Sequence, residues 1–285
     1  MTSSSDLSAA HERASGQAAY QLSVVIVHEN TVGLLRNCLK SVVAETGLAL
    51  EIIVVDNAST DGSADLVAHE FPRARLIRNS ENVGFARANN QGLRASSGRY
   101  ALLLNSDTVV RPGALASLVK FMETHPAVGA CSPRLVRPDG TPQPYAFGED
   151  PTLRYLLQRA TNQVFFHRYL HNWGCSALQV VDWVSGACLL ARREAIDQVG
   201  LLDENFFMYL EDNDWCLRLR RAGWKICYYP KAEVIHLGGQ SLQQKPSARA
   251  AYARSLKYFY AKHYSRPAQW ALRLLLPVYM RIRRP

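Results

Sequence analysis

Short apolar runs that alternate with helical stretches constrain the fold of the first part of the chain more than any other feature. Residues 22–27 (LSVVIV), 51–55 (EIIVV) and 99–104 (RYALLL) are rich in β-branched residues and leucine. Such runs are typical of strands that are buried on both faces of a parallel sheet. Apolar residues at helical spacing in 31–44 and 85–95 supply the crossover connections that parallel strands need. The pattern predicts an α/β protein with a doubly wound sheet of four or five strands.

The second part of the chain is less regular. Prolines and aromatic residues without a clear period fill residues 133–181, which predicts loops and a short helix. Loops of this kind commonly determine substrate specificity. Regular patterning returns at 183–191 and is followed by an expected helix over 212–222 and two short strands at 224–229 and 232–236.

The basic charge of the chain is concentrated at its C-terminal end. The net charge is +9, yet residues 245–285 contain ten Lys or Arg and no acid, so the other 244 residues carry 23 basic and 24 acidic groups. A nucleic-acid-binding protein gains affinity from every phosphate that its basic groups neutralise, and here only the tail could contribute. We therefore expect no nucleic-acid partner, and the tail needs its own explanation.

The N-terminal segment and the cysteines favour a cytoplasmic protein. Residues 1–20 are polar, rich in Ser and Ala, and lack an apolar core, which predicts a disordered lead and not a signal peptide. The six cysteines form no CxxC pair and mostly lie in apolar stretches, as reduced thiols do.

Polar residues follow three expected strands at the point where each strand ends. In an open α/β sheet, ligands bind beyond the carboxyl ends of the strands. The residues at this edge are His28, Glu29, Asn30, Asp56, Asn57, Asn105, Ser106 and Asp107. They predict a nucleotide and metal pocket, with one alternative: Asp56 lies in the turn-forming segment DNASTDGS and could cap the segment that follows.

Asp107 and His236 are the candidate metal ligands. Asp107 ends the most apolar expected strand, and Mg²⁺ or Mn²⁺ takes one or two carboxylates plus substrate phosphates. The alternative for Asp107 is a turn-forming role. His236 precedes LGGQS, whose glycines allow close backbone approach to a ligand, but a lone histidine is more often packed or solvated.

An acidic cluster, Glu211, Asp212 and Asp214, lies at the start of the expected helix over 212–222. Acids in a first helical turn cap free N–H groups and complement the helix dipole. Capping requires one acid and not three. A carboxylate held rigidly at a helix start can also act as a general base.

The tail itself has two expected parts. Tyr252, Leu256 and Phe259 form a helical stripe that we expect to pack on the body. Residues 267–285 mix aromatic residues, leucines and arginines, and their longest apolar run, 274–280, is too short to cross a bilayer. This composition predicts adsorption to an anionic membrane surface, the alternative being a helix pair that only covers the domain.

Taken together, the motifs resemble those of the inverting family-two glycosyltransferases of the GT-A fold, in their rhamnosyltransferase-like branch. In order, the matching motifs are LSVVIV, VVDNASTDGS, ENVGFARANNQGL, LLLNSD, VSGACLLARREA, FFMYLEDNDWCLRLRRAGW and AEVIHLGGQS. They cover residues 22–241 in the family's order, which is far more specific than any one motif. The resemblance implies a mainly parallel nucleotide-binding sheet flanked by helices, an acceptor-side extension and a C-terminal helical tail.

The resemblance also implies roles for individual residues. Asp212 is similar to the catalytic base, and Asp107 and His236 to the ligands of Mg²⁺ or Mn²⁺. The residues implied to bind the nucleotide sugar are Val27, Asn30, Asp56, Asn57, Arg87, Asn89, Asn105 and Ser106. Those implied to lie near the transferred sugar or acceptor are Trp183, Gly186 and Glu211. One departure concerns the donor: the branch usually has Asn-Tyr-Asn where this chain has His28, Glu29 and Asn30, and an acid near a diphosphate is unfavourable.

The implied function is inverting transfer of a sugar onto a polyprenyl-diphosphate-linked saccharide in cell-envelope polysaccharide synthesis, at the inner face of the cytoplasmic membrane. The donor favoured is dTDP-L-rhamnose, with a UDP- or GDP-sugar as the alternative, and a homodimer is left open. The implied division is a lead over 1–20, a nucleotide-sugar half over 21–132, an acceptor and catalytic half over 133–244, and a basic helical tail over 245–285. The rival from another class is a non-catalytic protein that binds membranes or nucleic acid through this tail.

Overall fold

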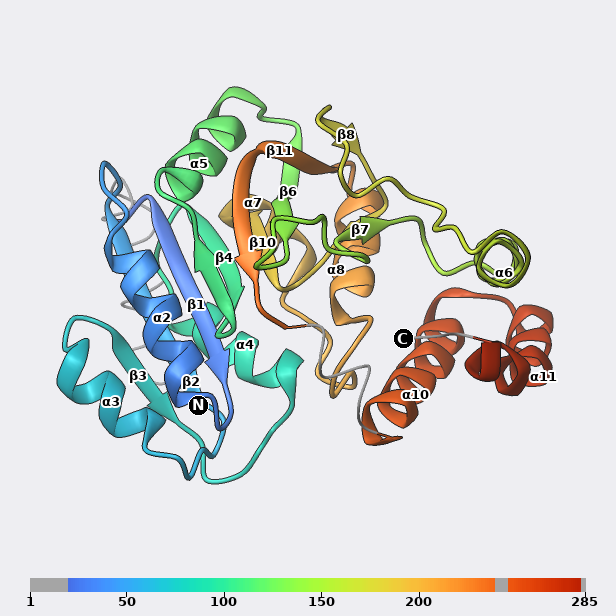
Figure 1. The fold of residues 1–285 in the computed structure, drawn as a ribbon, viewed down its shortest axis with the longest axis horizontal. Coiled ribbons are helices and arrows are strands. Elements are labelled where there is room, and N and C mark those ends of the chain that lie inside the picture. The colour runs from blue at the N-terminus through green and yellow to red at the C-terminus, as the bar shows by residue number, and fades with distance from the viewer. Residues whose placement is uncertain (1–19, 239–245, 283–285) are drawn as a thin grey trace.

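The computed structural model describes residues 20–238 and 246–282. The expected disordered lead falls outside the described residues, apart from Tyr20, and so does most of the LGGQS segment after His236. Figure 1 shows a central twisted sheet with helices on both faces and a group of helices beyond one end of it.

The first part of the chain forms the expected parallel sheet with helical crossovers. Four parallel strands are ordered β3-β2-β1-β4. Their interior is fully buried, as at Val24, Ile26 and Val54, because helices cover both faces. The elements are β1 (Leu22–His28), α2 (Val32–Val43), β2 (Leu50–Asp56), α3 (Ser63–Glu70), β3 (Arg75–Arg78), α4 (Phe85–Ala95) and β4 (Tyr100–Asn105).

The sheet is larger than the sequence predicted. Within the described residues nine strands form one sheet in the order β3-β2-β1-β4-β10-β6-β11-β5, with β8 on β11. The predicted doubly wound sheet of four or five strands is therefore too small. The sheet also contains antiparallel pairs, because β10 runs antiparallel between β4 and β6 and β5 runs antiparallel beside β11. The added elements are β5 (Thr108–Val110), α5 (Ala114–Thr124), β6 (Val128–Val136), β8 (Gln179–Val180), β10 (Cys188–Arg192) and α7 (Arg193–Val199). A small ribbon pairs β7 (Phe147–Gly148) with β9 (Trp183–Val184).

The two short strands expected at 224–229 and 232–236 are a single strand, β11 (Lys225–His236). Its register with β6 shifts between Tyr229 and Glu233, where Pro230 cannot donate to the ladder. An irregularity inside one strand looks like a gap between two in the sequence. The continuous strand places His236 opposite Thr108, beside the end of β4.

The tail forms two helices, α10 (Pro246–His263) and α11 (Arg266–Ile282), which pack on each other. Helix α11 also packs on α6 (Leu153–Thr161), which a π-helical turn, η1 (Asn162–Phe166), continues. The predicted stripe is confirmed, since Tyr252, Leu256 and Phe259 are buried. With residues of α6, α11 and α8 (Glu211–Arg221) they form a second apolar cluster, separate from the sheet core. In the part of the chain that the structure describes, no helix has the length and apolar character to cross a membrane.

Candidate active site

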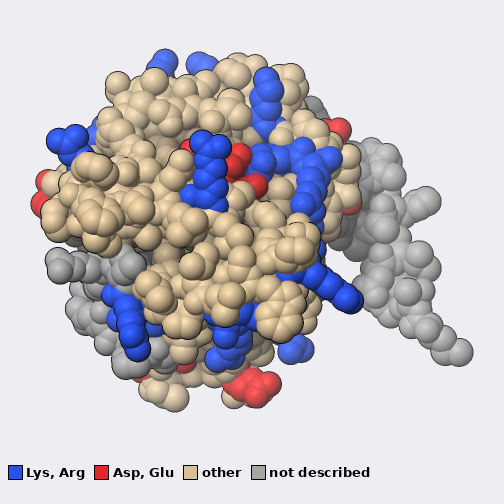
Figure 2. Space-filling model, turned by 90° about the vertical axis from the view of Figure 1, so that its right-hand side faces the viewer, with Lys and Arg blue, Asp and Glu red and all other residues tan. Residues whose placement is uncertain are grey.

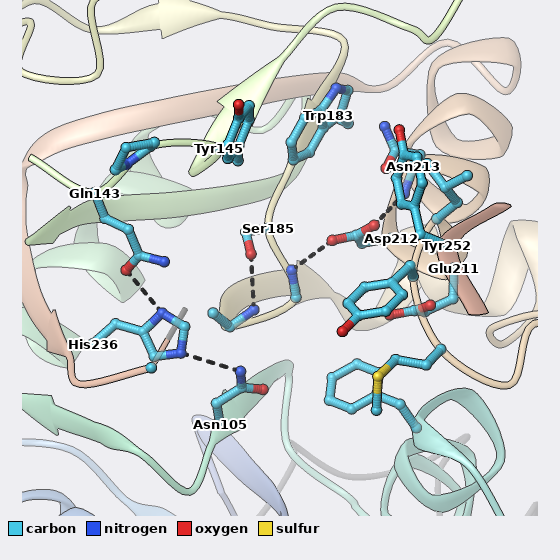
Figure 3. Close-up of a pocket in the computed structure, with 18 of the residues that line it drawn as sticks. Asn105, Gln143, Tyr145, Trp183, Ser185, Glu211, Asp212, Asn213, His236 and Tyr252 are labelled. Atoms are coloured by element: carbon cyan, nitrogen blue, oxygen red, sulfur yellow. Dashed lines mark hydrogen bonds between the residues drawn. The ribbon is translucent and has the colours of Figure 1, made fainter. Parts of the chain in front are cut away.

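A cavity of about 470 Å³ lies between the ends of β4 and β11, the start of helix α8 (Glu211–Arg221), and the tail helices. In the part of it drawn in Figure 3, Asn105 and His236 lie opposite Asp212 and Glu211, and Tyr145 and Trp183 lie along one side. The predicted residues that line it are Asn105, Asp107, Trp183, Gly186, Glu211, Asp212 and His236. Residues 129 positions apart in the chain, Asp107 and His236, therefore share one site.

Asp107 and His236 face each other at the end of the sheet. His236 Nε2 lies 3.0 Å from Asp107 Oδ1, and His236 Nδ1 donates to Gln143 Oε1 at 2.8 Å. A neutral ring with its proton on Nδ1 turns the Nε2 lone pair toward the carboxylate. Two electron-pair donors facing each other at this distance suit a shared cation, and a fixed tautomer is typical of metal-binding histidines. Within the described residues, no group of three or more His, Cys, Asp or Glu forms a metal cluster.

Gly238 explains part of the LGG motif. A Cβ atom at this position would lie 2.0 Å from Asp107 Oδ2 and 2.9 Å from His236 Nε2. The backbone therefore passes directly over the carboxylate and the imidazole, an approach that glycine alone permits. Any larger residue would displace the Asp107 side chain.

Asp212 is held by backbone N–H groups at the start of α8. Its Oδ2 accepts from Gly186 N at 3.0 Å and its Oδ1 accepts from Asn213 N at 2.8 Å. Burial raises the pKa of Asp212 above its ordinary value, and these hydrogen bonds only partly oppose that rise. A rigid carboxylate with a raised pKa is a better proton acceptor near neutral pH than an ordinary aspartate.

The three acids of the cluster have three different environments. Burial, and then the charge of Asp212, raises the pKa of Glu211 well above its usual range, so folding favours its protonated form. Burial alone would raise the pKa of Asp214, but hydrogen bonds from His263 and Lys262 lower it. Asp214 also accepts a hydrogen bond from Arg218 of its own helix at 2.8 Å. Its contacts with Lys262 and His263 connect α8 to α10, and Asp214 does not line the cavity.

Several of the expected nucleotide residues form a separate group along the β1 and β2 ends, whereas Asn105 lines the cavity. Asp56 is buried, 3.6 Å from His28 Nε2, and its Oδ1 accepts from Ser59 N at 3.0 Å. Burial lowers the pKa of His28, which favours its neutral form beside Asp56. One carboxylate oxygen of Asp56 therefore caps the segment that follows, as the alternative interpretation predicted. Val27 is half-buried on β1, and Ser106 Oγ lies 3.1 Å from Thr31 Oγ1.

Amide side chains organise the loops around this group. Asn57 Oδ1 accepts from Val83 N at 3.0 Å, and its Nδ2 donates to Asn82 Oδ1 at 2.8 Å. Asn82 Nδ2 in turn donates to Glu29 Oε2 at 2.7 Å, so the carboxylate that departs from the branch pattern has a partner. Asn30 Oδ1 accepts from Thr60 N at 2.8 Å.

Two further residues that were predicted to bind the nucleotide sugar lie on α4. Asn89 is 1% exposed and donates to Phe85 O of its own helix at 2.9 Å. Arg87 is exposed, with its Nε 3.8 Å from Glu204 Oε2. Neither lines the cavity that holds Asp107 and Asp212.

Several cavity residues were missed in the sequence. Gln143, Tyr145, Arg159, Arg249 and Tyr252 all line it. The first three come from the segment without periodicity, and the last two from the tail. Aromatic and basic residues are frequent in both segments, but no spacing in the sequence brings them together.

The fold and the site together define a glycosyltransferase of the GT-A type: a parallel sheet half, an Asp–His pair at its edge, and the Asp212 carboxylate across the cavity. The chain belongs to glycosyl transferase family 2, since the model of that family matches residues 23–198.

Two relatives illustrate the similarity in sequence. The N-acetylglucosaminyl-diphospho-decaprenol L-rhamnosyltransferase of Mycobacterium tuberculosis is 32% identical over 277 residues, which cover 88% of this chain and 89% of the relative. The low-salt glycan biosynthesis hexosyltransferase Agl10 of Haloferax volcanii is 27% identical over 220 residues, 75% of this chain and 66% of that protein.

Solved structures share the fold. The mannosyltransferase PcManGT of Pyrobaculum calidifontis, in complex with GDP-Man and Mn²⁺, aligns with a TM-score of 0.58 at 18% identity over 93% of this chain and 69% of that one. GalNAc-T7, with UDP, GalNAc and Mn²⁺, aligns with a TM-score of 0.61 at 19% identity over 90% of this chain and 52% of that one.

Proposed function

We propose that this glycosyltransferase inverts the configuration of a sugar that it transfers from a nucleoside diphosphate, with Asp212 as the base. The observation that carries the proposal is the Asp212 carboxylate, fixed by Gly186 N in the cavity that also contains Asp107 and His236. In this proposal residues 21–132 bind the donor, and residues 133–244 supply the acceptor site and the base.

The reaction is a single displacement. The acceptor hydroxyl oxygen attacks the anomeric carbon, its proton passes to Asp212, and the bond from that carbon to the diphosphate oxygen breaks. Attack from the face opposite the leaving group inverts the anomeric centre. The raised pKa of Asp212 suits it to take this proton near neutral pH.

Asp107 and His236 would hold Mg²⁺ or Mn²⁺, with Gln143 fixing the imidazole. Such an ion, when bound, neutralises the charge of the donor diphosphate. The donor set fits, because an acid oxygen and an imidazole nitrogen already face each other. The donor nucleotide would extend from there toward Asp56 and Arg87, past the loops that Asn57 and Asn82 order.

For the substrates we propose dTDP-L-rhamnose and a polyprenyl-diphosphate-linked saccharide, on the basis of the 32% identity to the mycobacterial rhamnosyltransferase. In the presence of Mn²⁺ or Mg²⁺, we expect the purified protein to transfer rhamnose from dTDP-rhamnose to a synthetic N-acetylglucosaminyl-diphospho-prenol. The product is detected by mass spectrometry, and its anomeric configuration by NMR. UDP- and GDP-sugars serve as competing donors. A product of retained configuration would contradict the inverting mechanism, and preference for another donor would contradict the rhamnosyl assignment.

The outer face of α11 supports peripheral attachment to the inner face of the cytoplasmic membrane. Trp270, Leu274 and Val278 follow each other at helical spacing and are 64%, 77% and 55% exposed, whereas Leu272 and Leu276 are buried. Figure 2 shows this side of the molecule, where Lys and Arg are distributed over a largely uncharged surface. Helices α10 and α11 contain no acid. An apolar stripe with basic surroundings is typical of helices that lie in a membrane interface.

Replacing Trp270, Leu274 and Val278 together by Ser should release the protein from anionic vesicles in a sedimentation assay, by about tenfold or more in partitioning, because apolar burial drives interfacial insertion. The fold should persist, since the three side chains point away from the second apolar cluster. The matched control replaces the exposed Leu34 and Val43, on α2 at the other side of the molecule. Equal sedimentation of the triple variant and the wild type would refute the attachment.

A further inference from the structure

The cavity has a second end, built by α6, α10 and α11. Arg159 in the last turn of α6 and Arg249 in α10 line it together with Tyr252 and Met280. These helices lie on the side of α8 away from β4 (Figure 1). This end is therefore distinct from the Asp107 end, and Asp212 at the start of α8 lies between the two.

Arg159 is in an uncommon environment for a cation. Its guanidinium carbon lies 4.3 Å from the centre of the Tyr145 ring. Its Nη2 atom is buried and has no hydrogen-bond partner within the described part of the chain. The ionisable groups with the largest influence on it are four phenols, Tyr279, Tyr252, Tyr145 and Tyr155. Arginine stays protonated, and a buried guanidinium nitrogen without a hydrogen-bond partner is costly, so this side chain favours an anionic ligand.

Arg249 adds a second positive charge to the same end. Its Nη2 donates to Met280 O near the end of α11, which holds the side chain against the cavity. Because α10 and α11 carry no acid, nothing on these two helices neutralises either cation. Two guanidinium groups can together bind a group with more than one negative charge.

The surface next to this end is apolar. Phe165 and Phe166 of η1, which follows α6 directly, are 73% and 66% exposed. Leu274 of the adjoining α11 is 77% exposed. A ligand with its anionic group at Arg159 could thus place a hydrocarbon chain along α6 and α11.

We infer that Arg159, supported by Arg249, binds the diphosphate that joins the acceptor saccharide to its lipid, an inference that rests on the proposed function. Guanidinium groups bind phosphate oxygens in a bidentate manner, and the Nη2 atom of Arg159 has no hydrogen-bond partner within the described residues. The acceptor then enters from the helical end and the donor from the β4 end. Their reacting atoms meet at Asp212.

The test uses farnesyl diphosphate as a probe, titrated calorimetrically into the full-length protein in EDTA, so that no metal ion contributes at Asp107. Arg159→Gln should weaken binding about 10- to 100-fold, because a charge-assisted, bidentate contact is lost. The affinity of Arg159→Lys should lie between those of the wild type and Arg159→Gln, since lysine keeps the charge and loses the bidentate geometry of the guanidinium. Arg154→Gln, on the exposed side of the same helix, should bind as the wild type does.

Two further probes separate the sources of the anion. Inorganic pyrophosphate should bind the wild type more weakly than farnesyl diphosphate, and farnesol should bind weakly and without dependence on Arg159. Farnesyl diphosphate binding that is unchanged in Arg159→Gln, or equally tight binding of pyrophosphate, would overturn the inference. If Arg159→Gln fails to fold by circular dichroism, Arg249→Gln provides the same comparison.

The readout also separates this inference from the proposed function, because it requires no sugar transfer. Arg159-dependent binding of farnesyl diphosphate without any transferase activity would refute the proposed function alone. Active transfer to the diphosphate-linked acceptor, with kcat/KM unchanged in Arg159→Gln, would refute the diphosphate site alone.

Discussion

Asp212→Asn should lower kcat for sugar transfer by about 10²- to 10⁴-fold, the usual contribution of a general base. Asparagine has the same shape, and its Oδ1 can still accept a hydrogen bond from Gly186 N or Asn213 N, but it cannot take the acceptor proton. Metal-dependent binding of dTDP or UDP should stay near wild type, because in the proposed mechanism Asp212 acts on the acceptor and not on the nucleotide. Transfer rates and nucleotide-induced thermal shifts measure the two effects separately.

The control for this variant is Asp197→Asn, an exposed acid on α7. It removes the same charge at a distance from the cavity and should leave both readouts unchanged. Turnover of Asp212→Asn above a tenth of normal would show that another group is the base. Loss of nucleotide binding together with transfer would indicate a folding defect instead.

The pH profile provides an independent check on the same residue. Because burial raises the pKa of Asp212, activity should be lost as the pH falls through that raised pKa, above the ordinary aspartate value of about 3.9. Glu211 lies beside it and also has a raised pKa. The loss of activity at low pH therefore reflects the titration of both carboxyl groups together. Folding favours the protonated form of both groups. Their ionisation therefore costs stability as the pH rises above the ordinary carboxyl range, and Asp212→Asn removes one such cost at neutral pH.

Asp107→Asn should abolish the dependence of nucleotide binding on Mn²⁺ or Mg²⁺ and lower transfer by about 100-fold or more, since metal stabilisation of the leaving diphosphate contributes several kcal/mol. An amide keeps the shape of the side chain beside Gly238 but is a much weaker ligand for a hard cation. The wild type, with nucleotide at 100 times its Kd, should gain about 2.7 kcal/mol of stability in the presence of the metal. The variant should gain the same with and without metal.

Asp65→Asn, at an exposed position on α3, is the matched control and should retain the metal-dependent shift. A full metal-dependent shift in Asp107→Asn would mean that the ion is held elsewhere. Equal loss in both variants would point to a general effect of charge on the protein.

Much of the first sheet could be predicted because its signals are local. The runs at 22–27, 51–55 and 99–104 are strands, as expected of short apolar stretches that are covered on both faces of a sheet. The helix stripe of Tyr252, Leu256 and Phe259 was equally readable, since its spacing matches one face of a helix.

The second part of the sheet could not be predicted in the same way. Strand β10 has an apolar sequence that fits a parallel or an antiparallel neighbour, and its place between β4 and β6 depends on the whole fold. Strand β11 contains a bulge at Pro230 that resembles a break. Pairing partners are non-local, so a local pattern does not determine them.

The acidic residues of the site also divide into features that the local sequence shows and features that depend on distant contacts. The sequence alone indicated that Asp107 follows a strand and that Glu211, Asp212 and Asp214 share a helix start, because both statements concern neighbours in the chain. Only the tertiary structure decided that Asp107 faces His236, that Asp212 is held by Gly186, and that Asp214 binds the tail through Lys262. Burial and hydrogen-bond partners from distant segments decide which carboxylate has a raised pKa and which is an ion pair. Those surroundings exist only once the sheet, α8 and the tail helices have packed together.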